Sequence, residues 1–308
     1  MIRKPLLVLT VVAAVLADHV SANVEIHRIA HQTREVEGWT VHVDPELLEG
    51  EHKETGDLAI RILGQRLHEI VLKLPEGPVA KLKEVPIYLD RAHPLGNAHY
   101  HPDGDWLERH GYDPAMEKAV HFTAAASLIR EASSPHAASV VLHELAHAYH
   151  DQVLGFDHPG ILAGYQVFCD SELFDNAATI GGDNRPHYGL TDHKEFFAEM
   201  TETFLVGNNY FPFNHVQLYQ THRPTYDLIA SIWGTDITPP TIDDSRPPSI
   251  LDLRILATLK SQRGDFDGAF KLIDEAQSRD ADREGRLASL RKTVEQMQAS
   301  SSAGEEER

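Results

Sequence analysis

The stretch His143-Glu144-Leu145-Ala146-His147 constrains this chain most, because it places two imidazoles and a carboxylate within little more than one helical turn. Residues i and i+4 of an α-helix lie on one face, so His143 and His147 can reach the same metal ion. Glu144 then stands beside the open position of that ion. The flanking residues are apolar, and burying three polar groups among them is costly unless they are paired or metal-bound. This favours a metal site over a chance match on a surface helix.

A catalytic zinc site normally has three protein ligands, so the sequence must supply one more. A second predicted helix, from about Leu190 to Val206, carries an acidic stripe at positions i, i+4 and i+7. The residues of the stripe are Glu195, Glu199 and Glu202. We expect Glu195, in the first turn, to be the third ligand and Glu199 to hold a ligand histidine. An alternative stays open, because with Asp192 as N-cap Glu195 would complete a capping box.

Taken together, these residues resemble the catalytic domain of anthrax lethal factor and related gluzincin-type metallopeptidases. The likeness covers roughly 143–204: the H-E-x-x-H turn, then Tyr188 seven residues before the string Glu195-Phe196-Phe197-Ala198-Glu199. Trp106-Leu107 and the string from Asn209 to Phe213 also look like a family of exported bacterial proteins of unassigned function that carry this zinc domain. The resemblance implies an α+β, zincin-like domain with a small mixed sheet and active-site helices.

The resemblance also implies roles for individual residues. It implies zinc ligation by His143, His147 and Glu195. It implies that Glu144 is the general base, that Tyr188 is a hydrogen-bond donor, and that Glu199 supports a ligand histidine. The expected function is that of a zinc metallopeptidase, in which Glu144 activates a zinc-bound water to hydrolyse peptide bonds.

Two other functions stay open at this stage. One is a zinc hydrolase that acts on a non-protein amide, such as a peptide link of the cell wall. The other is a non-catalytic binding protein stabilised by zinc. The presence of Glu144 argues against the second, because a structural zinc site needs no base and normally has four protein ligands.

The N-terminus has the pattern of an export signal. Arg3 and Lys4 precede the apolar run from Leu6 to Ala17, and small residues follow before Asn23. We therefore expect residues 1–22 to be removed and the protein to be secreted or periplasmic. The run is short for a membrane span, which needs about 20 apolar residues; a retained anchor is the alternative.

The composition limits the classes of partner that this protein is expected to bind. The formal net charge of −19 argues against non-specific binding to nucleic acid or to anionic membranes, which needs a basic surface. We expect a peptide or protein substrate, no nucleic acid, and no membrane contact once the signal is removed. The one cysteine, Cys169, cannot form an internal disulfide, so stability must come from the core, a metal, or both.

The chain divides into a predicted catalytic domain at 23–242, a linker at 243–248, a helical hairpin at 249–298 and a polar, disordered tail at 299–308. We expect the segment before Pro78 to be part of the fold and not a removable pro-segment. The hairpin resembles one tetratricopeptide repeat around Gly264 to Phe270, with Ala276 seven residues after Ala269. A single repeat cannot bury its own face, so we expect it to dock on the catalytic domain or on a protein partner.

Local patterns predict the main elements of the catalytic domain. Strands are expected at 39–43, 85–89 and 119–122. If the last of them lies at a sheet edge, its free backbone groups could pair with an extended peptide. Helices are expected at 57–74, 106–112, 135–154 and 190–206, with Ser134 capping the third. The stretches 91–105 and 156–186 read mostly as loops. His99 and His101 in the first of them raise the question of a second metal, but a polar loop is the favoured interpretation.

Overall fold

The computed structural model describes residues 26–134, 139–235, 250–262, 264–279 and 285–306. The chain has a mixed α+β fold, mostly helical with a small mixed sheet, which confirms the predicted class. The predicted signal peptide and the predicted linker at 243–248 lie outside the described residues. Within the described residues, no helix combines the length and apolar character that crossing a membrane requires.

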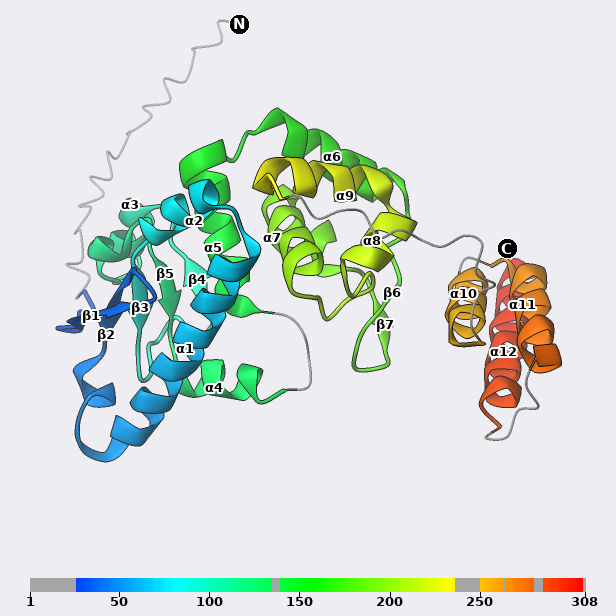
Figure 1. The fold of residues 1–308 in the computed structure, drawn as a ribbon, viewed down its shortest axis with the longest axis horizontal. Helices are drawn as coiled ribbons and strands as arrows, with labels where there is room; N and C mark the ends of the chain where they lie inside the picture. Colours follow the sequence, from blue (N-terminus) through cyan, green and yellow to red (C-terminus); the bar gives the residue numbers. More distant parts are fainter. Residues whose placement is uncertain (1–25, 135–138, 236–249, 263, 280–284, 307–308) are drawn as a thin grey trace, which may run out of the picture.

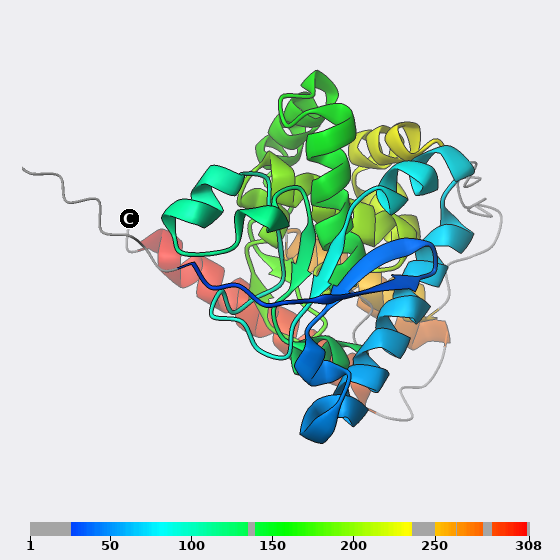
Figure 2. The ribbon, with the colours of Figure 1, turned by 90° about the vertical axis from the view of Figure 1, so that its left-hand side faces the viewer.

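The main sheet has five strands in the order β1-β2-β3-β5-β4. Their bounds are β1 Gln32–Val36, β2 Trp39–Val43, β3 Ile87–Leu89, β4 His99–Tyr100 and β5 Val120–Phe122. β2, β3 and β5 run parallel, and antiparallel β1 and β4 form the two edges. Glu37 and Gly38 join β1 to β2 with positive φ at both residues, the backbone of a type I′ hairpin turn. Figure 2 shows this hairpin at the near side of the molecule.

The predicted strand at 119–122 is present as β5, but it does not lie at the sheet edge, the position in which it could have paired with an extended peptide. β5 lies between β3 and β4, and all three of its residues are buried, as in a strand covered on both faces. The edge strand next to β5 is the two-residue β4, which lies within the stretch predicted as a loop. A strand this short has too few residues for an alternation of polar and apolar side chains to be recognised.

The two faces of the sheet differ in chemistry. One face contributes Trp39, Val41, Ile87 and other apolar side chains to the main core, against α1 (Lys53–Lys73) and α5 (Val140–Tyr149). This confirms that the segment before Pro78 belongs to the fold. The other face presents a row of polar aromatic side chains from neighbouring strands: His42, Tyr88 and His121 stand side by side in register.

The helices continue the fold beyond the sheet. They are α2 Glu76–Lys83, α3 Gly104–Arg109, α4 Ala125–Ala132, α6 Pro159–Asp170, α7 His193–Leu205, α8 His215–Thr221 and α9 Arg223–Trp233. Figure 1 shows α6, α7, α8 and α9 on the side of α5 away from the sheet, with the small β6–β7 pair (Ala177–Ala178 and Asn184–Arg185) below them. α5 starts later than predicted: Ser139 is its N-cap, accepting from the amide of Leu142, and π-helical residues His150–Leu154 follow it.

α6 lies within the stretch 156–186 that was predicted to be mostly loop. His158 caps this helix and Pro159 occupies its first turn. This stretch is rich in glycine, and glycine weakens isolated helices; Gly164 nevertheless lies within α6. Its role is close packing: a Cβ at Gly164 would come within 2.4 Å of the Leu228 side chain on α9.

The C-terminal region forms a group of three helices with its own small cores. They are α10 Ile250–Gln262, α11 Phe266–Arg279 and α12 Arg286–Glu306 (Figure 1). Ala257, Ala269, Ile273 and Val294 form one buried cluster among them. The predicted hairpin therefore has a third helix against it. α12 also continues to Glu306, so the prediction of a disordered tail from Ala299 is wrong for its described part; once nucleated, a helix extends through residues of modest propensity.

Candidate functional site

The two predicted helices of the motif pack against each other and bring their polar faces together. His143 Nε2 and His147 Nε2 lie 3.2 Å apart on α5. The Glu195 Oε2 atom, from the first turn of α7, is 3.1 Å from His143 Nε2 and 3.5 Å from His147 Nε2. One donor atom from each of the three residues therefore lies within 4.8 Å of the others.

The local structure explains why Glu195 faces the histidines. Asp192 Oδ1 accepts from the backbone amides of Lys194 (2.8 Å) and Glu195 (2.9 Å), so it caps α7 as predicted. The Glu195 carboxylate contacts the two imidazoles instead of completing a capping box. Two imidazole nitrogens and one carboxylate oxygen converging on a point are a donor set that fits Zn²⁺. These residues could therefore hold a metal.

Glu202, and not Glu199, is the nearest carboxylate to the outer nitrogen of His143. His143 Nδ1 is 2.8 Å from Glu202 Oε1 and 3.6 Å from Glu199 Oε1. Glu202 Oε2 also accepts from the Ser139 amide at 2.6 Å, which ties it to the start of α5. Glu199 is held elsewhere, because it accepts from the Asn208 side chain at 2.9 Å. The i+7 spacing marked Glu202 as part of the acidic stripe but did not show which carboxylate reaches the ring.

The histidines and carboxylates of this group shift one another's pKa values. Burial acts to raise the pKa of Glu195, but its hydrogen bonds to His143 and His147 outweigh burial and hold it well below the usual range. Burial and the neighbouring Glu202 carboxylate raise the pKa of Glu199 to about 7. Several negative groups therefore surround two imidazoles, an environment that attracts a cation.

Glu144 lies beside this group and lines a cavity of about 330 Å³. Its Oε2 atom accepts from the backbone amide of Tyr100 in edge strand β4 at 2.8 Å. Gly96 to Ala98, His143 and Tyr188 line the same cavity. Sequence reasoning missed the contact with Tyr100, because residues 44 positions apart meet only through the fold.

Tyr188 stands in a single 3₁₀ turn, Tyr188–Leu190, just before α7. Its ring lies 6.4 Å from the His143 ring, and the residue is 45% exposed at the cavity. Burial and the Glu195 carboxylate raise the pKa of its hydroxyl, which keeps it protonated and able to donate a hydrogen bond at neutral pH. The structure therefore brings Tyr188 to the same cavity as Glu144.

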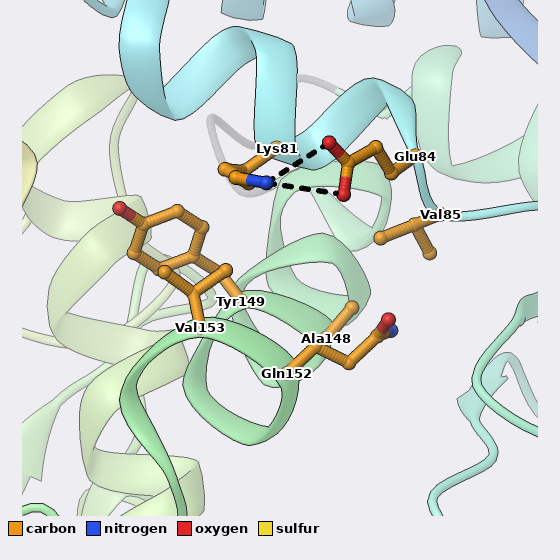
Figure 3. Close-up of a pocket in the computed structure, with 7 residues that line it drawn as sticks. All are labelled: Lys81, Glu84, Val85, Ala148, Tyr149, Gln152 and Val153. Atoms are coloured by element: carbon orange, nitrogen blue, oxygen red, sulfur yellow. Dashed lines mark hydrogen bonds and ion pairs between the residues drawn. The ribbon is translucent and has the colours of Figure 1, made fainter.

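A second pocket, of about 270 Å³, lies on another side of α5 (Figure 3). It is lined by Lys81, Glu84, Val85, Ala148, Tyr149, Gln152 and Val153. Lys81 Nζ pairs with the Glu84 carboxylate at 3.0 Å, which leaves both charges of the pocket neutralised by each other. None of the candidate site residues lines it.

Comparisons with protein-family models, with curated proteins and with solved structures found no match to this chain. The resemblance to gluzincin-type metallopeptidases therefore stays a prediction from the motif.

Proposed function

We propose that this protein is an exported, zinc-dependent metallopeptidase with a zincin-like catalytic domain of the gluzincin type. The observation that carries the proposal is the convergence of His143, His147 and Glu195 on one point, with Glu144 at the adjoining cavity. The three converging residues come from two helices far apart in sequence, α5 and α7. It supports a His₂Glu ligand set with one side left for substrate.

Zinc, when bound, would supply a Lewis acid that polarises a carbonyl and acidifies water. Glu144 would take the proton of the attacking water and pass it to the leaving amine, a contribution of roughly 10²–10⁴-fold. The amide of Tyr100 holds Glu144 Oε2, which fixes the direction of the carboxylate. The Tyr188 hydroxyl would donate to the oxygen on which negative charge develops.

The cavity suggests how a peptide would lie. Its wall includes Gly96 to Ala98, directly before the edge strand β4, whose outer edge pairs with no other described strand. The Tyr100 amide of this strand is held by Glu144. The remaining backbone groups at the edge can pair with an extended peptide, and side chains of that peptide would then enter the cavity. This favours peptide substrates over the other amides considered.

Replacing Glu144 by Gln tests the proposal. We expect Glu144→Gln to lose at least 10²-fold in kcat on a peptide library and to retain one bound zinc, because the carboxylate acts on the proton and not on the metal. The matched control is Glu108→Gln on α3, an exposed glutamate outside the cavity, which should keep full activity.

Two outcomes would contradict the proposal. Hydrolysis that survives in Glu144→Gln would remove Glu144 from the mechanism. Hydrolysis of cell-wall muropeptides without cleavage of any peptide in the library would replace the peptidase by a hydrolase of another amide.

A further inference from the structure

A second group of potential metal ligands lies on the polar face of the sheet. Asp90, His93 and His121 each offer a donor atom, and these atoms lie within 4.8 Å of one another. Asp90 and His121 are completely buried, and His93 is 8% exposed. None of these residues belongs to the candidate active site.

The backbone fixes these three residues in place. Asp90 directly follows β3, and its amide donates to Phe122 of β5 at 2.9 Å. The amide of His93 donates to Thr123 at 2.8 Å, so the loop after β3 is tied to the end of β5. His121 is the central residue of β5. The donors are therefore preorganised by the sheet and do not depend on a free loop.

Two further histidines contact the group: His31 contacts Asp90, and His101 contacts His121. His31 Nε2 is 2.6 Å from Asp90 Oδ1, whereas His121 Nε2 is 2.8 Å from Asp90 Oδ2. His101 Nε2 is 3.2 Å from His121 Nδ1. If His121 carries its proton on Nδ1, it donates to His101 and leaves Nε2 free as a ligand. Such partners on the far side of ligands are usual in metal sites.

The surroundings of Asp90 favour a cation here. Its carboxylate is completely buried, between His31 and His121. In the part of the chain that the structure describes, Asp90 pairs only with these two histidines and with no lysine or arginine. A buried carboxylate without a full positive partner is costly.

The geometry points to a second metal site, in which Asp90, His93 and His121 bind a divalent transition ion such as Zn²⁺. Imidazole and carboxylate donors suit this class of ion. Because the group is excluded from solvent, the ion would clamp the loop after β3 to β5. The inference does not rest on the proposed peptidase activity.

Metal stoichiometry of the full chain tests the inference. The double variant His143→Ala/His147→Ala removes the first candidate site, and after incubation with Zn²⁺ and desalting we expect it to retain one equivalent of zinc. Adding His93→Ala to this variant should remove that equivalent, while adding His110→Ala, an exposed histidine on the surface, should not. Retention of no zinc by a folded double variant would overturn the inference.

A second measurement covers a double variant that fails to fold. Wild-type protein loaded with Co²⁺ should bind two equivalents, and His93→Ala one, with loss of part of the visible absorption of the bound cobalt. A wild-type protein that binds a single equivalent, unaffected by His93→Ala, would mean that the histidines and Asp90 form only a hydrogen-bonded cluster.

Discussion

The His143 ring is contacted by carboxylates at both nitrogens, Glu202 at Nδ1 and Glu195 at Nε2. With Nδ1–H donating to Glu202 at 2.8 Å, the lone pair of Nε2 faces His147 and Glu195. Glu202 is itself anchored by the Ser139 amide and is only 3% exposed. The orientation of the ligand ring therefore depends on a residue two helical turns beyond Glu195.

Glu202→Gln should weaken zinc binding. We expect a 10–100-fold rise in the zinc dissociation constant, the usual effect of losing a carboxylate that holds a ligand histidine. The matched control is Glu199→Gln, which should change the constant by less than about 3-fold, because Glu199 is held by Asn208 and lies 3.6 Å from the ring. Competition with a chromophoric chelator measures both constants. A larger effect in Glu199→Gln would restore the assignment made from sequence.

At the scale of elements, α5 ends in an unusual way. The π-helical residues His150–Leu154 follow it, and both ring nitrogens of His150 are buried with no hydrogen-bond partner among the described residues. The ring packs against Phe156 and Phe197 at 5.2 and 5.1 Å. Burial, with His193 nearby, lowers the pKa of His150 to about 3. The imidazole of His150 is therefore neutral in the folded protein at neutral pH.

This predicts a pH-dependent stability. Between the ordinary pKa of 6.5 and the folded value of about 3, the unfolded chain binds a proton at His150 that the folded chain does not. Stability contributed by the neutral ring is thus present above pH 6.5 and falls as the pH drops, by at most about 1.4 kcal/mol per pH unit.

His150→Leu should remove this dependence. We expect the variant to be about 1 kcal/mol more stable at pH 7, because an unpaired buried polar group is removed, and to lose less stability than wild type between pH 7 and 5. Urea unfolding at both pH values measures the difference, and His110→Leu at an exposed site should match wild type. An equal loss in His150→Leu and wild type would show that the pKa of His150 does not differ between the folded and unfolded states.

Elements with long or regular patterns were predictable from sequence, and those fixed by distant contacts were not. The strand at 39–43 and the helices at 57–74 and 190–206 follow their polar and apolar periodicity closely. β4 and α6 were missed, because a two-residue strand has no period and Gly164 serves packing against α9. In the candidate site, the H-E-x-x-H motif and the acidic stripe could be recognised from the sequence. The contacts of Glu202 with Ser139 and of Tyr100 with Glu144 depend on residues 63 and 44 positions apart.

At the scale of the whole molecule, the apolar cores are separate. The main core joins the sheet, α1, α5 and α7, and extends to Trp233 at the end of α9. The C-terminal helices bury Leu253, Ala257 and Ile273 in clusters that contain no residue of the main core. Folding of the region 26–235 should therefore not require α10, α11 or α12.

Deleting 250–308 should leave the region 26–235 folded. We expect the main thermal transition to shift by less than about 2 °C, because the main core loses no buried side chain; a change of 1 kcal/mol would shift a domain of this size by roughly 2–4 °C. Hydrolysis of short peptides should persist, and any loss should be confined to a protein substrate that the C-terminal helices recruit. The control is Leu63→Ala on α1, a fully buried residue of the main core, which should cost about 2–5 kcal/mol. If the deletion lowers the transition as much as Leu63→Ala does, the C-terminal helices stabilise the region 26–235 directly, and the division into two cores does not describe how the molecule folds.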